Sequence, residues 1–224
     1  MQIVGHRGAR AVAPENTLRA VRLGARCADF VEIDVRLSRD GVPVVIHDAT
    51  LDRTTGGTGP VAALTAGELM TLDAGGGEHI PALAEACDAV RGTCGLVVEI
   101  KEPESIATVA RVLAASAPAP LVIVSFHAAA IAGIADLLPG ARTGLILHPD
   151  EADGIRNAVA AGADIVLPHR SALSAGLVAG AHREGLAAWF WTLNTEAEWA
   201  LAVAAEADAV ATDDPCGARS FLSR

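Results

Sequence analysis

Two acidic residues, Glu32 and Asp34, lie two positions apart inside the apolar run that starts at Phe30. In an extended strand, side chains at this spacing point to the same face. Ionised carboxylates on a buried face cost several kcal/mol unless they are paired with cations or bind a metal. The pattern predicts either a salt-bridged strand end or a divalent metal site. His47, at the end of the following apolar run, favours the metal site.

Two other apolar runs end in polar residues of the same kind. His6 and Arg7 follow the run that opens the chain, and Glu99 and Lys101 repeat the two-apart spacing after the run that starts at Leu96. Three strand ends thus carry two histidines, three carboxylates, an arginine and a lysine. Such a concentration is hard to explain as structure alone, and it predicts a catalytic site.

These side chains together suit phosphoryl transfer. The three carboxylates are hard oxygen donors with no cysteine among them, so the expected ion is Mg²⁺ or Ca²⁺ rather than zinc. Arg7 and Lys101 can hold an anionic oxygen group, the arginine in bidentate fashion. His6 and His47 can act as acid and base near neutral pH. In such a reaction the cations stabilise the phosphorus oxygens, one histidine activates the nucleophile and the other protonates the leaving oxygen.

Short apolar runs alternate with helical stretches along most of the chain, which is typical of a (β/α)8 barrel. An open doubly wound sheet is the alternative, but no glycine-rich dinucleotide motif follows the first strand. We expect one catalytic domain over residues 1–224, with an insertion at about 49–80 after strand two and its hairpin partner at 42–46. The eight predicted barrel strands cover residues 2–5, 30–35, 95–100, 121–125, 143–147, 163–167, 187–191 and 208–211. The predicted helices cover residues 15–27, 66–72, 81–91, 104–116, 128–138, 151–161, 172–184, 195–205 and 214–222.

Active sites in such barrels lie at the carboxyl ends of the strands, and polar residues gather there in this sequence. Phe126 follows strand four and Trp191 follows strand seven, so both are expected to line a pocket and contact substrate. Asp213 and Asp214 follow the last strand and are expected to cap the last helix rather than bind metal.

The residues around the insertion leave alternatives open. Asp48 either holds His47 in one tautomer or caps the following turn. Glu15 and Asn16 either start a helix or orient the site, and Arg53 is expected to form a structural salt bridge. The histidines away from the three strand ends, at positions 79, 127, 148, 169 and 182, are interpreted as surface or helix residues.

The composition of the chain indicates a globular protein and argues against nucleic-acid binding and a membrane helix. The chain has 224 residues, of which 51% are hydrophobic, so it can bury a large core. Its net charge of −10 argues against a nucleic-acid surface. No run approaches the ~18 apolar residues of a membrane helix, so no stable membrane association is expected. Oligomeric state is not indicated by the sequence.

The four cysteines form no CxxC pair and no metal-type spacing. We therefore interpret them as free thiols in a reducing compartment, with Cys27 and Cys87 in helices. The apolar run at the amino terminus ends at Gly5, so no signal peptide is visible, and a cytoplasmic location is predicted.

The sequence resembles the glycerophosphodiester phosphodiesterase family, and the resemblance covers nearly the whole chain. One departure from the family pattern is that Ala82 and Ala84 replace polar positions, which concerns the packing of the insertion. The short insertion also suggests a small or open pocket. The matching pieces are HRG at 6–8, PENT at 14–17, EIDVRLSRDGVPVVIHD at 32–48, LDRTTGGTG at 51–59, IPAL at 80–83, VEIK at 98–101, SF at 125–126, WTLN at 191–194 and ATDDP at 211–215.

The resemblance implies a TIM-type barrel with a short insertion after strand two. Members of the family commonly use Ca²⁺ or Mg²⁺ to cut glycerophosphodiesters into glycerol 3-phosphate and an alcohol, so a small-molecule partner of this class is implied. Carried over by position, the resemblance implies metal ligands at Glu32, Asp34 and Glu99, a catalytic pair at His6 and His47, and phosphate contacts at Arg7 and Lys101.

Several alternatives to this hydrolase stay open. The same site suits a lysophospholipase D-type enzyme, or a cyclising phosphodiesterase in which a substrate hydroxyl attacks, as in the related sphingomyelinase D enzymes. A hydrolase of C–O or C–N bonds would leave Arg7 and Lys101 without an anion to hold. A phosphate-binding module without turnover would not need the pair His6 and His47.

Overall fold

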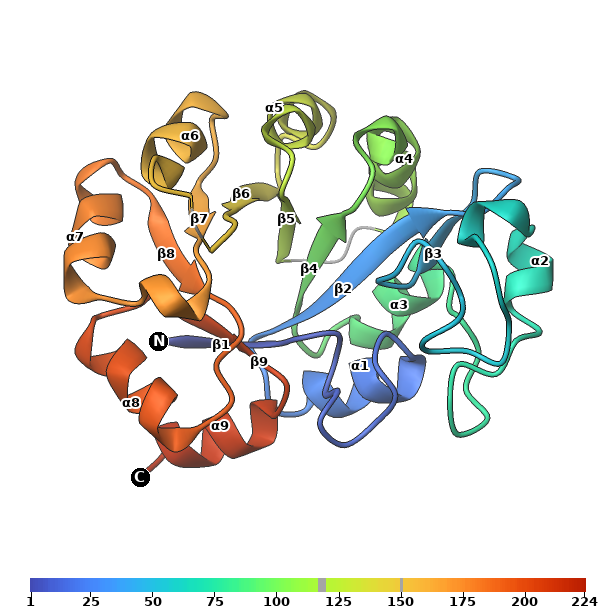
Figure 1. Ribbon diagram of the computed structural model, residues 1–224, viewed down its shortest axis with the longest axis horizontal. Helices are drawn as coiled ribbons and strands as arrows, with labels where there is room; N and C mark the ends of the chain where they lie inside the picture. Colours follow the sequence, from blue (N-terminus) through green and yellow to red (C-terminus); the bar gives the residue numbers. More distant parts are fainter. Residues whose placement is uncertain (117–119, 150) are drawn as a thin grey trace.

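The computed structural model describes residues 1–116, 120–149 and 151–224. In these residues eight parallel strands close into a barrel, in the order β1, β2, β4, β5, β6, β7, β8, β9 and back to β1 (Figure 1). The predicted barrel is confirmed, and each strand end lies within two residues of its predicted position. The strands are β1 (Gln2–Gly5), β2 (Phe30–Leu37), β4 (Gly95–Ile100), β5 (Leu121–Ser125), β6 (Arg142–Ile146), β7 (Ile165–Leu167), β8 (Ala187–Phe190) and β9 (Ala209–Thr212), with β3 (Pro43–Val45) antiparallel to β2.

Helices surround the barrel (Figure 1). Most begin at a hydroxyl or carboxylate cap that satisfies free backbone N–H groups, as Thr195 does for α8 and Asp214 for α9. The helices are α1 (Leu18–Ala25), α2 (Ala66–Leu69), α3 (Leu83–Val90), α4 (Ile106–Ser116), α5 (Ala128–Leu137), α6 (Gly154–Ala160), α7 (Ala175–Arg183), α8 (Glu196–Ala204) and α9 (Pro215–Leu222). Short 3₁₀ turns form η1 (Val61–Ala63), η2 (Pro103–Ser105) and η3 (Arg170–Ala172).

The first helix starts later than predicted. Its expected start at Glu15 is wrong because Asn16 has a φ of 59°, in the left-handed region, and Thr17 caps the helix instead. The same delay occurs at α7, where the chain first makes the turn η3 and Ser174 then caps the helix. Side-chain capping thus fixes boundaries that apolar periodicity alone places too early.

Apolar side chains fill both the inside of the barrel and the space between strands and helices. Inside, Phe30 and Trp189 close the lower end with ring centroids 5.4 Å apart. Gly95 is required beside them, since a Cβ at this position would collide with the ring of Phe30. Above this plug of aromatic and branched residues, a cavity opens towards the carboxyl ends of the strands.

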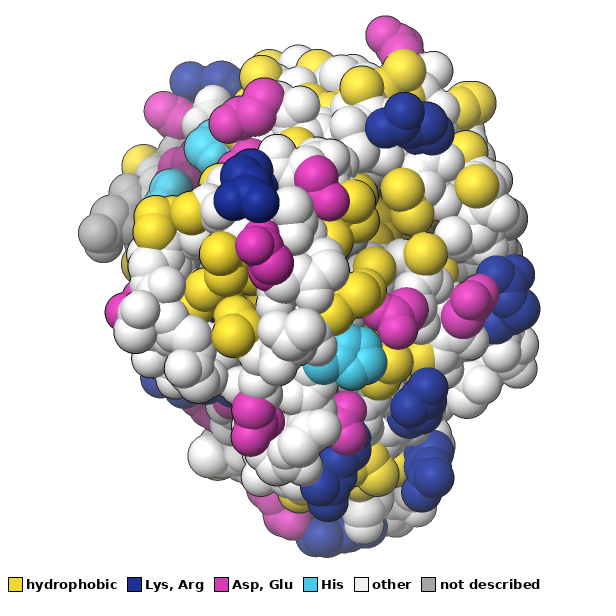
Figure 2. Space-filling view, turned by 90° about the vertical axis from the view of Figure 1, so that its right-hand side faces the viewer, with side chains coloured by type: hydrophobic (Ala, Val, Ile, Leu, Met, Phe, Trp, Pro, Cys, Tyr) yellow, Lys and Arg dark blue, Asp and Glu magenta, His cyan; other side chains and the backbone are white. Residues whose placement is uncertain are grey.

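The chain between β3 and α3 makes an excursion beside β2, at the right of Figure 1. It contains η1 and α2 and has a small apolar core that includes Ile46, Leu51, Leu69 and Ile80. Figure 2 views this side of the molecule, where side chains of both charge signs lie next to one another. No described helix is long and apolar enough to cross a membrane.

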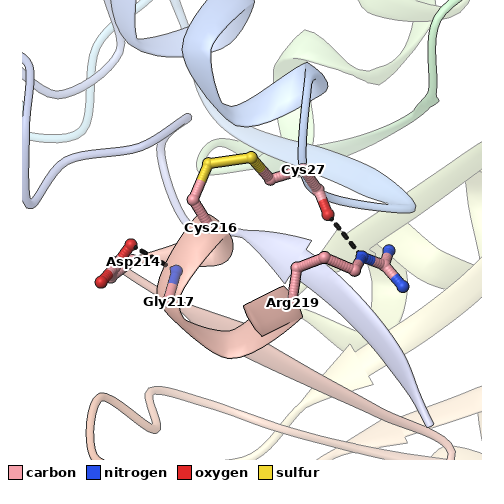
Figure 3. The surroundings of a disulfide bond; sticks show 5 residues. All are labelled: Cys27, Asp214, Cys216, Gly217 and Arg219. Atoms are coloured by element: carbon pink, nitrogen blue, oxygen red, sulfur yellow. Dashed lines mark hydrogen bonds between the residues drawn. A yellow bond between two sulfur atoms is a disulfide. The ribbon is translucent and has the colours of Figure 1, made fainter. Parts of the chain in front are cut away.

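A disulfide joins Cys27 to Cys216, which corrects the prediction of four free thiols (Figure 3). Cys27 lies in the turn after α1 rather than in a helix, and Cys216 lies in the first turn of α9. Arg219 adds a hydrogen bond of 2.8 Å from Nε to the carbonyl oxygen of Cys27. Cys87 is in α3 as expected and, with Cys94, is free. The cysteine pattern therefore gives no support to a reducing compartment.

Candidate active site

Strand register brings three acids together at the mouth of the barrel. Asp34 on β2 is paired with Glu99 on the neighbouring parallel strand β4, and Glu32 lies two residues before Asp34. All three side chains are buried, and ligand oxygens from each lie within 4.8 Å of one another. The two-apart spacing in the sequence therefore does place these carboxylates on one inner face of the barrel.

Two cations and an amide hold this group of acids. The backbone N–H of Arg7 donates to Glu32 at 2.8 Å, and its guanidinium Nε lies 3.2 Å from Asp34 Oδ2. Lys101 Nζ contacts Asp34 Oδ1 at 2.8 Å and also pairs with Glu99. Asn16 donates from Nδ2 to Asp34 at 2.7 Å, so it orients the site in addition to its place before α1.

The loop that presents Arg7 has an unusual backbone. Arg7 has a φ of 52° and Gly8 a φ of 88°. A Cβ at Gly8 would collide with the backbone of Ala20, so only glycine fits there. A non-glycine residue in the left-handed region costs of order 1 kcal/mol and persists where its surroundings determine it, which is common at functional sites. Here the contacts of Arg7 with the acids and with Glu15 fix the turn.

The acids carry more negative charge than the two cations balance. Burial, followed by the charge of Asp34, raises the pKa of Glu99 to about 7 against the opposing effect of Lys101. Burial and the neighbouring carboxylates also raise the pKa of Glu32, whose Oε1 is buried and has no hydrogen-bond partner among the described residues. Burial opposes ionisation of Asp34 too, but the charges of Lys101 and Arg7 outweigh it and lower the pKa of Asp34.

This set of residues fits a divalent cation. All three candidate ligands offer carboxylate oxygen, the donor that Mg²⁺ and Ca²⁺ prefer. The unpartnered Oε1 of Glu32 is an acceptor that such an ion would satisfy. A cation would also favour the ionised forms of Glu32 and Glu99, which burial otherwise disfavours.

Each of the two candidate histidines has its Nδ1 against a carboxylate. His6 Nδ1 lies 2.7 Å from Asp213 Oδ1, and His47 Nδ1 lies 2.6 Å from Asp48 Oδ1. Asp48 is in turn clamped by Arg53, whose Nε donates at 2.6 Å and which also binds Glu15. Burial lowers the pKa of both imidazoles, more than their carboxylate partners raise it. Both rings are therefore mainly neutral at pH 7.

A cavity of about 180 Å³ opens between these groups. One side is charged, and the opposite side is apolar and ends in two aromatic rings. Phe126 and Trp191 pack edge to face with centroids 5.7 Å apart, and Trp191 Nε1 donates to the carbonyl of Leu167 at 2.9 Å. Of the nine residues predicted for the site, eight line this cavity: His6, Arg7, Glu32, His47, Glu99, Lys101, Phe126 and Trp191. The ninth, Asp34, lies behind Arg7 and Lys101.

One residue near the site differs from its predicted place: Asp214 caps α9 as expected, but Asp213 contacts His6 instead. His148 is exposed and His169 is partly exposed, as predicted. In addition, His148 stacks on Phe126 with ring centroids 4.7 Å apart and His169 lies against Trp191 at 5.0 Å, so these two histidines extend the aromatic side of the cavity. No local pattern marks these contacts, because each joins loops that follow different strands. Arg53 forms the expected salt bridge, although its partners belong to the site.

Known proteins resemble this chain along its whole length. YhdW of Bacillus subtilis is 33% identical over 96% of this chain and 95% of its own length. The glycerophosphodiester phosphodiesterase of Caldanaerobacter subterraneus is 31% identical, with 95% of this chain and 94% of the relative covered. An Oleispira antarctica phosphodiesterase, solved in complex with the product sn-glycerol-3-phosphate, superposes with a TM-score of 0.94 at 31% identity, over 100% of this chain and 97% of that one. The model of the glycerophosphoryl diester phosphodiesterase family matches residues 6–216, and the chain belongs to that family.

Proposed function

We propose that this protein is a divalent-metal-dependent phosphodiesterase that hydrolyses glycerophosphodiesters to glycerol 3-phosphate and an alcohol. The observation that carries the proposal is one cavity that combines three buried carboxylates, two cations and two histidines. The product named for the Oleispira antarctica structure supports the glycerol 3-phosphate side of the substrate. The alternative of C–O or C–N hydrolysis is less well supported, since it gives Arg7 and Lys101 no anion to bind.

Glu32, Asp34 and Glu99 would hold the metal, with Mg²⁺ and Ca²⁺ as the fitting ions. When bound, such an ion neutralises charge on the phosphoryl oxygens and helps orient the phosphate. Asn16 supports this role from the side, because its amide accepts from the backbone of Asp34 and donates to its carboxylate. The ligand carboxylate is thereby fixed before any ion arrives.

Arg7 and Lys101 face the same cavity and would bind the phosphate. Both already contact the acids, so each can bridge a carboxylate and a phosphoryl oxygen through its separate N–H groups. The apolar side with Phe126 and Trp191 would receive the organic part of the substrate and exclude water from it.

His6 and His47 would exchange protons with the reacting oxygens. Each has Nδ1 occupied by a carboxylate and lines the cavity with the rest of its ring. One, in its neutral form, takes the proton of the attacking water as the new P–O bond forms. The other must first be protonated on the ring nitrogen that faces the cavity, and it gives that proton to the alcohol oxygen as the old P–O bond breaks. The residues come from the ends of β1, β2 and β4 and from the loop after β3, so we also propose that residues 1–224 act as one catalytic unit.

Hydrolysis of glycerophosphocholine and glycerophosphoethanolamine tests the proposal. Release of glycerol 3-phosphate should require Ca²⁺ or Mg²⁺, stop in EDTA, and fall strongly in His6→Ala and Glu99→Ala. His182→Ala serves as the matched control, since His182 pairs with Asp208 on the outer side of the barrel. Turnover that persists in EDTA, or that survives both site variants, would contradict the proposal.

The same assay separates hydrolysis from cyclisation. In ¹⁸O-labelled water, attack by solvent places one label in the glycerol 3-phosphate released in a single turnover. Attack by a substrate hydroxyl gives an unlabelled cyclic phosphate. Accumulation of that cyclic product, or turnover of lysophospholipids only, would move the assignment to a cyclising or lysophospholipase D-type enzyme on the same site.

A further inference from the structure

Asp213 lies at the mouth of the barrel. The sequence predicts that it caps the last helix, but in the structure it contacts His6. Its Oδ1 lies 2.7 Å from His6 Nδ1. The contact joins residues 207 apart in the sequence. It forms because β1 pairs with β9, with Gly5 opposite Thr212, so the residues that follow these two strands meet where the barrel closes.

The helix cap does not explain Asp213. The neighbouring Asp214 caps α9 by accepting from the backbone N–H of Gly217 at 2.9 Å. Asp213 Oδ2 instead accepts from Asn194 Nδ2 at 2.9 Å, and Asn194 Oδ1 accepts from the backbone N–H of Asp213 at 2.9 Å. Arg10 Nε adds a cation 3.5 Å from Oδ1. The carboxylate is thus fixed from three directions, with one oxygen aimed at His6.

Asp213 is ionised at neutral pH. Burial works against ionisation, but the hydrogen bond with His6, the charge of Arg10 and the hydrogen bond with Asn194 act in the opposite direction, and the pKa of Asp213 is lowered. An ionised carboxylate only accepts hydrogen bonds, so neutral His6 must carry its proton on Nδ1. In the described residues nothing hydrogen-bonds to His6 Nε2, and the ring lines the cavity. The lone pair of Nε2 is then available to a reacting group.

We propose that Asp213 is a positioning residue that holds His6 in the Nδ1–H tautomer and directs its Nε2 into the cavity. The proposal rests on the proposed function, and it adds a residue that acts through His6 without contacting substrate. Asn194 contributes by fixing the carboxylate. The pair Asp213 and His6 is the counterpart, on the other side of the cavity, of the pair Asp48 and His47.

The test combines kinetics with the tautomer of His6. In Asp213→Asn the amide can donate to Nδ1 and favours the Nε2–H tautomer, so kcat should fall on the order of 10²-fold with KM unchanged, within the range of general acid–base catalysis. Asp213→Glu, which keeps a carboxylate, should recover part of this loss. Asp214→Asn is the matched control: asparagine caps a helix about as well as aspartate, so the same change of acid to amide one residue away should leave the Tm and kcat nearly unchanged.

Two-bond ¹⁵N–¹H correlation spectra of the labelled full chain at about pH 8, above the ordinary imidazole pKa, report the tautomer directly. The His6 signals are assigned by their loss in His6→Ala. Wild type should show the Nδ1–H form and Asp213→Asn the Nε2–H form. If Asp213→Asn fails to fold, Asn194→Ala gives a milder shift towards mixed tautomers with a smaller loss of kcat.

An Nε2–H tautomer in the wild-type chain would overturn the proposal, as would an Asp213→Asn variant no slower than Asp214→Asn. If the wild-type chain turned over no glycerophosphodiester, the proposed function would fail, and the tautomer would still decide the placement of Asp213.

Discussion

The cavity at the mouth of the barrel has two unlike sides. The side formed after β1, β2 and β4 is charged, and its groups are held by directional hydrogen bonds and ion pairs, as Asp34 is by Arg7, Asn16 and Lys101. The side formed along β5 to β8 is apolar and is held by packing, with Trp191 and Phe126 at its edge.

The difference separates two tasks. Directional contacts fix atoms to within a fraction of an ångström, which metal and proton chemistry require. Packing excludes water and sets a shape, which decides what organic group can enter. Changes on the charged side should therefore alter kcat, and changes on the apolar side should alter KM and the choice of alcohol.

The largest effect is expected from Glu99→Gln on the charged side. It keeps the shape of the side chain but weakens one of three ligands, so kcat/KM should fall on the order of 10³-fold, as the loss of several kcal/mol of charge stabilisation implies. Isothermal titration with Ca²⁺ should show weaker binding in the same variant. Unchanged metal affinity would mean that Glu99 is not a ligand.

Asp48→Asn should cost less, on the order of 10²-fold in kcat, because His47 stays in place while its tautomer is no longer fixed. The matched control is Asp52→Asn, the same change at an acid whose side chain accepts from the backbone N–H of Gly59 in the excursion, away from the two histidines. If Asp48→Asn and Asp52→Asn had the same kcat, Asp48 would have no role in catalysis.

Metal affinity should depend on pH through Glu99. With a pKa of about 7 in the metal-free protein, Glu99 holds a proton that a cation must displace. The affinity should therefore fall about tenfold from pH 8 to pH 6, with protons released on binding. In the metal-free protein the folded state holds this proton more tightly than the unfolded chain does. Protonated Glu99 therefore adds to the free energy of unfolding. This contribution is fully present below about pH 4.5 and is lost as the pH rises through about 7.

Calorimetry of Ca²⁺ binding in buffers of different ionisation enthalpy measures the proton release, and thermal unfolding of the metal-free protein measures the stability. The difference in stability between wild type and Glu99→Gln isolates the contribution of this group from that of the histidines. A pH-independent affinity would contradict the raised pKa.

The smallest effect is expected on the apolar side. Trp191→Leu should raise KM about fivefold, since it removes an aromatic contact worth about 1 kcal/mol, and should leave kcat and metal affinity nearly unchanged. The ratio of rates for choline and ethanolamine diesters should shift. If Trp191→Leu lost as much kcat as Asp48→Asn, the apolar side would contribute to catalysis and not only to substrate binding.

The parts of the molecule that were predicted correctly depend on short-range patterns. Alternating apolar runs and helices specify the barrel, and in a barrel the carboxyl ends of all strands meet at one rim. Register between β2 and β4 then places Asp34 beside Glu99. The fold alone therefore brings the predicted site residues together, and their individual side-chain contacts are not needed for the prediction.

The parts that were missed depend on contacts between distant segments. Closure of the barrel brings Asp213 to His6 and Cys216 to Cys27, the latter pair 189 residues apart in the sequence. Neither spacing carries a local signal. The late start of α1 has a different cause, since the left-handed Asn16 gives up the helical conformation while its side chain binds Asp34.

The most direct test of metal-dependent hydrolysis at the charged side is to titrate Ca²⁺ into metal-stripped enzyme while following glycerol 3-phosphate release from glycerophosphocholine. We expect no release before metal is added, a rise that saturates with one metal site per chain, and no rise in Glu99→Gln at the same concentrations. Full turnover by protein shown by elemental analysis to contain no metal would contradict the central claim.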